Sequence, residues 1–184
     1  WCRQQGRDPR ELPLIIESLA LWRKIHQRTR CDVGFRQCGI LYLANTAKDV
    51  ADREAWLQHG LAYGVESRMV SSKEINKLLP GSNEQWAGGL YTPTDGRAEP
   101  TIAAPAIARA ARQLGARIFT QTAVRGIEKT GGRISAVVTE NGSVQCSTVI
   151  LAGGAWSSTF CRNLDLRLPL LMTIGSVFRT APLN

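Results

Sequence analysis

The sequence predicts an α/β fold of the α+β kind, in which helices and the strands of a mixed sheet form two layers. Apolar residues recur at three- and four-residue steps from Leu12 to Ile25, which is typical of a helix with one packed face. The consecutive apolar residues Val149-Ile150-Leu151 end in Ala-Gly-Gly, as a buried parallel strand does before a tight turn. Asn141-Gly142 between two strand-like runs predicts a β-hairpin.

The first half of the chain is predicted to alternate helices with strands. Asp8 before Pro9, Thr46 with Asp49, and Ser71 with Glu74 are three helix-start signals, and Pro13 leaves the first helix start open. Gly64 and Pro80-Gly81 are the matching stops. The intervening apolar runs predict strands at 32–43 and 86–92, the second closed by turn residues at 93–96.

The second half is predicted to be one alanine-rich helix followed by strands. The helix covers Thr101 to Leu114, with Pro105 in its first turn, Gly115 as its stop, and a packing face made of Ile102, Ala106, Ile107, Ala110, Ala111 and Leu114. Strands are expected at 117–124, 134–140, 144–146 and 148–151, then a helix at 157–164 and an extended segment at 168–179.

Composition excludes several classes of protein. No apolar run approaches the roughly 18 residues that a membrane span needs, and no export signal is visible at the N-terminus. The five cysteines are scattered without C-x-x-C spacing, so we expect free thiols, a cytoplasmic location and no metal site. His26 and His59 are expected on helix surfaces, which leaves no Ser/His/Asp triad.

The net charge of +8 raises the question of a nucleic-acid partner. The arginines are spread along the chain, however, and no DNA- or RNA-binding motif is present. We therefore expect no nucleic-acid partner. A basic surface suited to anionic ligands is one interpretation of the charge, and a merely solvated surface is the other.

The segment from Val149 to Ser157 carries the clearest chemical signal. Ala152-Gly153-Gly154 lets a ligand approach the backbone at the end of the apolar strand. The N–H groups of the helix that begins beyond it suit a phosphate or another polar group. The alternative is that the two glycines only make a tight turn.

The order of elements around this segment adds a family resemblance. From Tyr91-Thr-Pro-Thr-Asp-Gly-Arg-Ala-Glu-Pro100 through Ser157, the chain resembles the D-amino-acid oxidase, glycine oxidase and sarcosine oxidase superfamily of flavoproteins. Arg3-Gln-Gln-Gly-Arg-Asp-Pro9 is similar to the segment that passes the flavin ring in the bacterial D-amino-acid dehydrogenase branch. The resemblance covers essentially the whole chain and implies an FAD/NAD(P)-binding-type two-layer fold.

The resemblance also implies site residues. It places Val124 against the adenine part of FAD, Ala152, Gly153 and Gly154 along the dinucleotide, and Trp156 beside it. Arg3 is expected near the isoalloxazine or a carboxylate.

On the substrate side, the candidate strands are 36–43, 87–92 and 170–179, with Tyr91 facing the substrate. Arg97 and Arg179 are weaker candidates. The alternatives are a core position for Val124, Trp156 and Tyr91, and a solvated one for Arg3. We name no catalytic acid or base, because flavin chemistry does not require one.

One element of the family pattern is missing, since no G-x-G-x-x-G occurs anywhere in the sequence. The chain therefore resembles a central fragment that lacks the N-terminal glycine-rich unit and the C-terminal cofactor segment. We expect FAD to be bound weakly or not at all by the chain alone. We also expect a homodimer formed through apolar surface that the missing segments leave uncovered.

These observations predict a substrate-binding layer at 1–98, part of the FAD-binding domain at 99–164, and a return strand at 165–184. The predicted activity of the parent enzyme is oxidation of an amine or amino acid, with hydride transfer to FAD. One alternative is a flavoenzyme of the same fold acting on a hydroxy acid or glycerol phosphate. The other is a non-catalytic binding or subunit-interface module.

Overall fold

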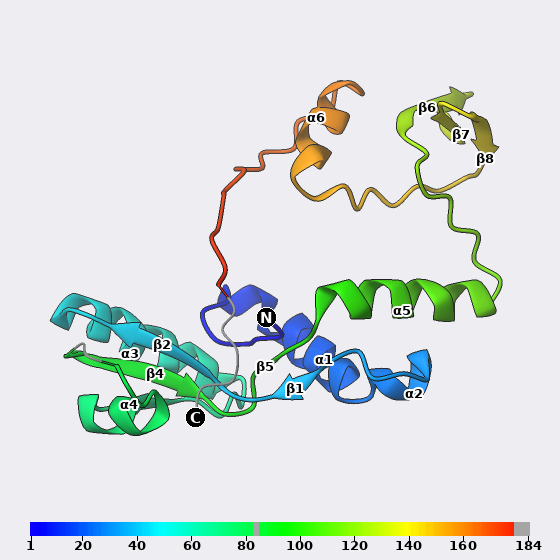
Figure 1. Cartoon of the computed structure of the whole chain (residues 1–184). Coiled ribbons are helices and arrows are strands. Elements are labelled where there is room, and N and C mark those ends of the chain that lie inside the picture. The colour runs from blue at the N-terminus through cyan, green and yellow to red at the C-terminus, as the bar shows by residue number, and fades with distance from the viewer. Residues whose placement is uncertain (83–84, 179–184) are drawn as a thin grey trace. The chain divides into compact units, whose positions relative to one another are not determined.

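The computed structural model describes residues 1–82 and 85–178, which fall into two compact units (Figure 1). The first unit runs from Trp1 to Ile118 and the second from Phe119 to Asn184. Helices and antiparallel sheets alternate along the chain, which confirms the predicted α+β character. Each unit is described by itself below.

The first unit opens with a short 3₁₀ helix, η1 (Pro9–Glu11), followed by α1 (Leu12–Arg23) and α2 (Ile25–Thr29). The Asp8 carboxylate caps η1 by accepting a hydrogen bond from the Arg10 amide at 2.9 Å. Pro13 is accommodated in the first turn of α1, where its missing N–H would have had no helical partner. Leu12 and Leu19, which belong to the predicted apolar stripe, are buried.

Two antiparallel sheets follow, and their pairing corrects the predicted strand at 32–43. That run divides at Gly39 (φ +75°) into β1 (Arg36–Gln37) and β2 (Ile40–Ala44). β1 pairs with β5 (Gly96–Arg97), and β2 pairs with β4 (Gly88–Thr92), the predicted strand at 86–92. Sequence reasoning missed β3 (Arg68–Val70), which flanks β4 on its other side.

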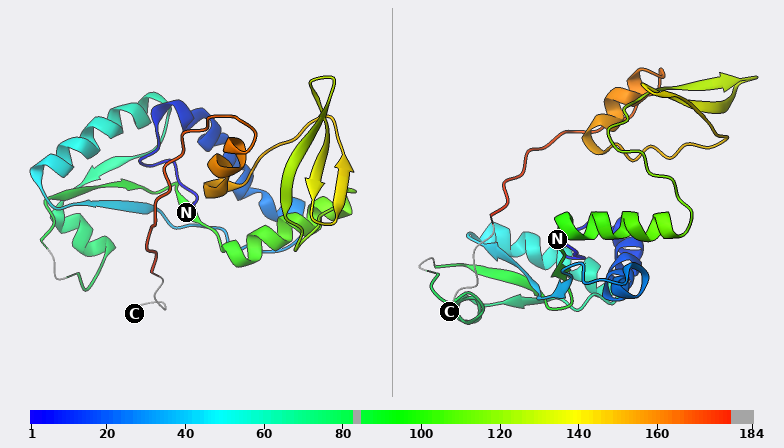
Figure 2. Two further views of the ribbon diagram at one scale, coloured as in Figure 1. Left: turned by 90° about the horizontal axis from the view of Figure 1, so that it is seen from above. Right: turned by 45° about the vertical axis from the view of Figure 1, so that its right-hand side comes forward.

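Two helices flank this three-stranded sheet. Helices α3 (Ala47–Ala62) and α4 (Ser72–Leu78) begin at the predicted capping boxes, in which both reciprocal hydrogen bonds are present. α3 runs along the sheet and contacts all three of its strands (Figure 2). Gly64 adopts a left-handed conformation (φ +73°) just beyond α3, as predicted for a stop.

The alanine-rich helix α5 (Pro100–Gln113) packs on Val33 through Ala103 and Ala106. Pro105 is the sixth residue of α5 and lies inside the helix, not in its first turn as predicted, because the helix begins at Pro100. Part of the predicted packing face is wrong, since large side chains on it remain between 42 and 90% exposed, namely Ile102, Ile107 and Leu114. Small alanines and not the larger residues form the contact, because they let the helix approach closely.

The second unit contains a three-stranded meander, β6 (Val124–Thr130), β7 (Arg133–Thr139) and β8 (Gly142–Gln145), which Figure 2 shows as an antiparallel sheet. The Asn-Gly hairpin is confirmed between β7 and β8. The predicted strand at 117–124 is wrong, because pairing with β7 begins only at Val124. Gly131 and Gly132, both at positive φ, make the β6–β7 turn.

The end of the chain departs most from expectation. Residues 148–151 and 168–178 form no strand, because neither run has a neighbouring strand among the described residues. Ile150 is 89% exposed as a result. A 3₁₀ turn, η2 (Gly154–Trp156), leads into α6 (Ser157–Arg162), which confirms the predicted helix start.

The α4 capping box supplies a pH-dependent contribution to stability. The Glu74 carboxylate accepts hydrogen bonds from the Ser71 amide and hydroxyl and pairs with Arg68 at 2.7 Å. These contacts, the amide bond first, lower the pKa of Glu74 from 4.5 to about 2. Because the pKa is depressed in the folded state, the stabilisation is complete above pH 4.5 and disappears as the pH falls through about 2.

We therefore expect Glu74→Gln to lower the urea midpoint at pH 7 and to match the unsubstituted chain near pH 2. Urea titrations of both proteins across this range measure the difference. A difference that stayed constant with pH would rule out the ionised carboxylate as its source.

Candidate cofactor and substrate site

A buried carboxylate anchors the N-terminal segment. Asp95 lies between β4 and β5 and is fully buried. Its Oδ1 accepts a hydrogen bond from the Gln4 amide at 2.8 Å, and its Oδ2 accepts one from the Gln5 amide at 3.0 Å. The Gln4 side-chain amide adds a third bond to Oδ1 at 3.1 Å. The carboxylate thus satisfies two consecutive backbone N–H groups about ninety residues away in sequence.

Further hydrogen bonds hold residues 2–5 along the edge of the sheet. The Cys2 and Gly96 backbones exchange hydrogen bonds of 2.8 Å in both directions. The Gln5 side chain donates to the Leu90 carbonyl at 2.9 Å. The segment at 3–9 and the segment at 91–100, which the resemblance had singled out separately, therefore meet at one place in the fold.

Arg3 lies on this anchored segment and is half-buried. Its guanidinium donates to the Gln5 carbonyl, and its central carbon lies 5.5 Å from the centre of the Tyr42 ring. Gly6 allows this contact, since a Cβ there would meet the Tyr42 ring at 2.7 Å. Arg3 is therefore held by protein groups instead of being freely solvated.

Tyr91 lies on β4, the central strand of its sheet, and is paired with Leu41 on β2 and Arg68 on β3. The Arg68 guanidinium carbon lies 5.7 Å from the Tyr91 ring centre. The Tyr91 hydroxyl packs over Gly39, where a Cβ would approach it to 2.4 Å. Tyr91 remains half-buried, so its ring is neither sealed in the core nor fully in solvent.

Arg97 follows on β5, opposite Arg36 on β1. Its guanidinium forms an ion pair with Glu99, and its side chain is 45% exposed. Arg3, Tyr91 and Arg97 thus belong to the same unit: Tyr91 lies on β4, Arg97 on β5, and Arg3 follows the Cys2 bridge to Gly96. Arg179, the remaining substrate-side candidate, lies outside the described residues.

The predicted cofactor residues of the second unit are open to solvent. Val124 is the first residue of β6, opposite Thr139, and is 49% exposed. Ala152 precedes the η2 turn, which Gly154 enters with a left-handed backbone (φ +54°). Nothing lies within 4 Å of a Cβ built on Gly154, and Trp156 is 76% exposed. These residues present backbone and ring surface that no described part of their unit covers.

Gly153 is more confined than Gly154. A Cβ at Gly153 would lie 3.2 Å from the Ser157 hydroxyl oxygen, and the Gly153 carbonyl accepts a hydrogen bond from the Trp156 amide at 3.1 Å. A glycine at position 153 is therefore explained by the close packing of the turn itself. Gly154 has free space beside it, which leaves its backbone accessible to a ligand.

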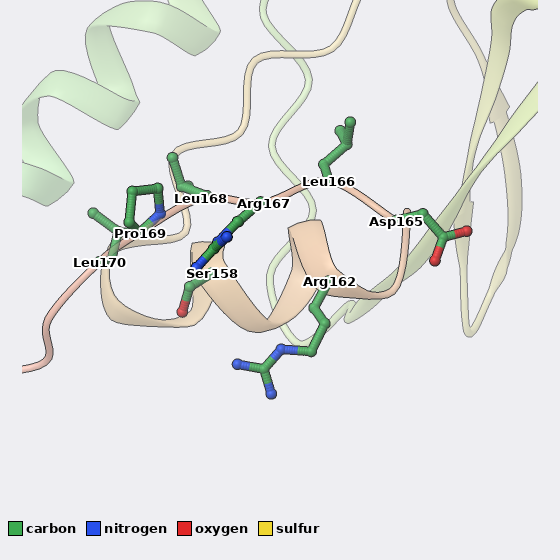
Figure 3. Close-up of a pocket in the computed structure, with 8 residues that line it drawn as sticks. All are labelled: Ser158, Arg162, Asp165, Leu166, Arg167, Leu168, Pro169 and Leu170. Carbon is green, nitrogen blue, oxygen red and sulfur yellow. The ribbon is translucent and has the colours of Figure 1, made fainter.

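A pocket that sequence reasoning did not foresee lies beside this turn (Figure 3). It has a volume of about 520 Å³ between the start of α6 and the following segment, and it is lined by Ser158, Arg162, Asp165, Leu166, Arg167, Leu168, Pro169 and Leu170. Figure 3 shows the Arg162 and Asp165 side chains extending in different directions. None of the predicted cofactor residues lines this pocket.

The cysteines are free and the histidines lie on helix surfaces, as the sequence predicts. All five cysteines are free, and burial raises the pKa of the Cys2 thiol, with Asp95 adding to the effect. A thiol with a raised pKa is a poor nucleophile near neutral pH. His26 and His59 are exposed on helices, and residues 1–82 and 85–178 contain no cluster that could hold a metal ion.

Sequence reasoning missed several of the residues that build this site. Gln4 and Gln5 give no signal by themselves, and the sequence predicts Asp95 as a turn residue within the 91–100 segment of the resemblance but not as an anchor of residues 4 and 5. Tyr42 and Arg53, whose guanidinium carbon lies 5.2 Å from the Tyr42 ring centre, were not singled out either. The one available signal was the rarity of buried carboxylates, which cannot be detected before burial is known.

The comparison with protein families decides the identity of this arrangement. The model described as "FAD dependent oxidoreductase" matches residues 1–184. The chain belongs to this family of FAD-dependent oxidoreductases. The predicted superfamily and fold are thereby confirmed.

Known members support the assignment at the level of sequence. Sarcosine dehydrogenase of Mus musculus is 32% identical over 155 residues, which cover 81% of this chain and 17% of that protein. D-amino acid dehydrogenase of Bradyrhizobium diazoefficiens is 33% identical over 133 residues, covering 72% and 31% respectively. The chain thus spans less than a third of the length of these two FAD-dependent oxidoreductase relatives.

A solved structure supports it at the level of the fold. L-amino acid deaminase from Proteus myxofaciens, in complex with anthranilate, superposes with a TM-score of 0.82 at 31% identity. The match covers 91% of this chain and 39% of that one. The α+β arrangement described above is therefore a part of the FAD-dependent oxidoreductase fold.

No membrane-crossing helix is present in the described part of the chain, since none of its helices combines the necessary length and apolarity.

Proposed function

We propose that this chain forms part of an enzyme that oxidises an amine or amino acid by hydride transfer to FAD. The observation that supports this proposal most strongly is the hydrogen bonding of Asp95 to the segment that contains Arg3. These bonds hold the segment against the strands that contain Tyr91 and Arg97. That contact joins the proposed flavin-passing segment to the proposed substrate sheet. The names of the relatives, a sarcosine dehydrogenase and a D-amino acid dehydrogenase among them, support the substrate class.

We assign the side chains of the first unit to the substrate. Arg3 would pair with a carboxylate or balance charge on a reduced flavin, and its contacts with the Gln5 carbonyl and the Tyr42 ring, which fix its side chain, support this role. Tyr91 offers a half-buried ring and hydroxyl next to Arg68. Arg97 has a weaker claim, since Glu99 already pairs with it.

We assign the open residues of the second unit to FAD. Val124 would meet the adenine part through its backbone, while Ala152, Gly153 and Gly154 would lie along the dinucleotide beside Trp156. The free space at Gly154 and the exposure of Trp156 fit a group that covers them. These residues would hold FAD, which would supply the hydride acceptor for the carbon that bears nitrogen, and water would then hydrolyse the imine product. The protein binds, orients and tunes charge.

We divide the chain into layers according to whether a segment is proposed to bind the substrate or FAD. Residues 1–98 form the substrate-binding layer, residues 99–164 contribute to the FAD-binding domain, and residues 165–184 return to the substrate layer. This is a different criterion from compactness, by which the chain divides after Ile118. The described part of the return segment has no strand partner to support this assignment further.

Cofactor retention is the first test. Because the sequence has no G-x-G-x-x-G and the cofactor residues of the second unit form one open wall, we expect the purified chain to be colourless after gel filtration. The absorbance spectrum of the eluted protein measures this. A yellow protein that kept its flavin through the column would show that the chain anchors FAD by itself.

Substrate class is tested separately with excess FAD, so that weak retention does not hide turnover. We expect anaerobic bleaching of the flavin with sarcosine or amino acids and none with lactate or glycerol phosphate, which contain a hydroxyl in place of the nitrogen. Faster bleaching by the hydroxy compounds would favour the rival flavoenzyme activity. Anthranilate, found in the complex of the Proteus myxofaciens enzyme, is a suitable competitor.

We also propose self-association through apolar surface of the second unit. Large side chains after α6 are almost fully exposed, Leu171 at 89%, Ile174 at 97% and Phe178 at 90%. Exposed patches of this kind drive association in water. Sedimentation velocity is expected to show a dimer that dissociates on dilution, and a single monomeric boundary at all concentrations would contradict it.

A cytoplasmic location and the absence of a nucleic-acid partner remain predictions, the first supported by the five free thiols.

A further inference from the structure

An open groove lies between α2 and α5, two helices of the first unit that contact each other (Figure 2). Its volume is about 830 Å³, which falls within the range of about 300–1,000 Å³ typical of small-molecule sites. The residues that line it belong to the two helices and to the positions that end them. We call it the α2–α5 groove.

Apolar side chains form one wall of the groove. Ile107, Ala110, Ala111 and Leu114 line it from α5, and their three- and four-residue spacing makes them one continuous stripe, about 10 Å long. Ile25 lines it from α2. Ile107 is 42% exposed and Leu114 is 90% exposed, so the described part of the unit leaves this stripe open to water. A ligand with an apolar chain would be stabilised by covering it.

Two arginines line the same groove beside the apolar stripe. Arg28 lies in the last turn of α2, Arg30 ends that helix, and both are exposed. Within residues 1–82 and 85–178, neither guanidinium forms an ion pair or donates a hydrogen bond, and no Asp or Glu lines the groove. Asp32, the carboxylate closest to Arg30 along the chain, already pairs with Arg36 at 2.7 Å.

The backbone carbonyls at the ends of both helices already have partners. The His26 carbonyl of α2 accepts a hydrogen bond of 2.8 Å from the Arg30 amide. The Ala110 and Ala111 carbonyls of α5 both accept from the Leu114 amide, at 3.2 and 3.1 Å. These bonds cap the helix ends, so the carbonyls are not left free to pair with the two guanidinium groups. The positive charge in the groove is therefore available to a ligand.

We propose that the α2–α5 groove binds an amphiphilic carboxylate, a molecule in which an apolar carbon chain ends in one carboxylate group. The chain would lie on the stripe from Ile107 to Leu114, and the carboxylate would accept hydrogen bonds from Arg28 and Arg30. Charge complementarity favours this ligand over a cationic amphiphile, and the apolar stripe favours it over a small hydrophilic anion. The inference does not depend on the proposed oxidation, because it uses no residue assigned to the substrate or to FAD.

Calorimetric titration of the 184-residue chain with sodium decanoate tests the site. Sodium acetate, which has the carboxylate without the chain, and decyltrimethylammonium chloride, which has the chain with the opposite charge, are the reference ligands, and both amphiphiles are kept below their micelle concentrations. We expect saturable binding of decanoate, and each reference ligand should bind at least about tenfold more weakly, the loss of one of the two kinds of contact.

Arginine variants test the charged part of the groove. Arg28→Gln and Arg30→Gln should each weaken decanoate binding about tenfold, because each removes one charge-assisted contact. Arg109→Gln is the matched control, since Arg109 is an exposed arginine on α5 that does not line the groove. Its affinity for decanoate should equal that of the unsubstituted chain.

Isoleucine variants test the apolar part independently. Ile107→Ala should weaken decanoate binding about fivefold, because part of the buried apolar surface is lost. Ile102→Ala is its control, since Ile102 lies on the same helix, is 46% exposed and does not line the groove. Equal losses in the groove variants and their controls would overturn the proposal. So would equal affinities for decanoate and decyltrimethylammonium, or no saturable binding of decanoate.

Discussion

Asp95→Ala is expected to lower the free energy of unfolding of the first unit by about 3 kcal/mol or more, since two amides lose a charged acceptor at a cost of about 1–3 kcal/mol each. The Gln4 and Gln5 amides would stay buried without partners unless the segment detached from the sheet. Detachment would also carry Arg3 away from Tyr42. Asp95→Asn should lower the free energy of unfolding by less than Asp95→Ala, because one oxygen can still accept a hydrogen bond. Some loss remains, since the new NH₂ group faces a donor.

Urea denaturation measures the change in stability, and hydrogen exchange at the Gln4 and Gln5 amides shows whether the segment detaches. Asp52→Ala is the control, because Asp52 is a surface carboxylate whose pair with Lys48 is largely exposed. If Asp95→Ala lost no more stability than Asp52→Ala, Asp95 could not be the anchor of the N-terminal segment.

Gly96→Ala is expected to be about as damaging, by roughly 2–4 kcal/mol, in the range of the large losses caused by forcing backbones apart. A Cβ at Gly96 would lie 2.3 Å from the Arg36 carbonyl oxygen and 3.1 Å from the Gln37 Cα. Both are backbone atoms, so no side-chain rotation relieves the contact. β1 would have to separate from β5, and the backbone bridge from Gly96 to Cys2 would be disturbed.

Gly126→Ala is the matched control, because Gly126 is also a strand glycine but has nothing within 4 Å of its Cβ position. Thermal melts of the two variants give the comparison. Equal melting temperatures for Gly96→Ala and Gly126→Ala would mean that β1 and β5 do not approach each other as closely as described.

Local signals explain why the helices could be predicted. The capping boxes of α3 and α4 involve residues three apart, so sequence spacing contains the whole interaction. The same holds for the Asn-Gly hairpin between β7 and β8. In each case the partners are neighbours along the chain, and no tertiary information is needed.

Strands failed where their pairing depends on distant residues. β3 consists of only Arg68, Met69 and Val70, and its formation depends on β4, which begins eighteen residues later. Residues 149–151 have the apolar character of a buried strand, yet no described strand lies beside them. An apolar run predicts what a strand would bury, whereas pairing decides whether it forms.

The site shows the same division between local and distant information. The resemblance indicated the segments at 3–9 and 91–100 separately, and only the structure joins them through Asp95. The Arg3–Tyr42–Arg53 arrangement likewise combines three elements that no sequence spacing connects. Residue type could suggest an arginine near a carboxylate, but it could not show which ring holds that arginine.

Parallel titrations with FAD and with duplex DNA test the central claim, which is that this chain contributes to a binding site for FAD. We predict a weak, saturable change in flavin fluorescence on adding the chain, and no DNA binding that falls steeply with salt. Strong, salt-dependent DNA binding with no flavin response would contradict the claim and favour a binding module whose basic surface meets nucleic acid.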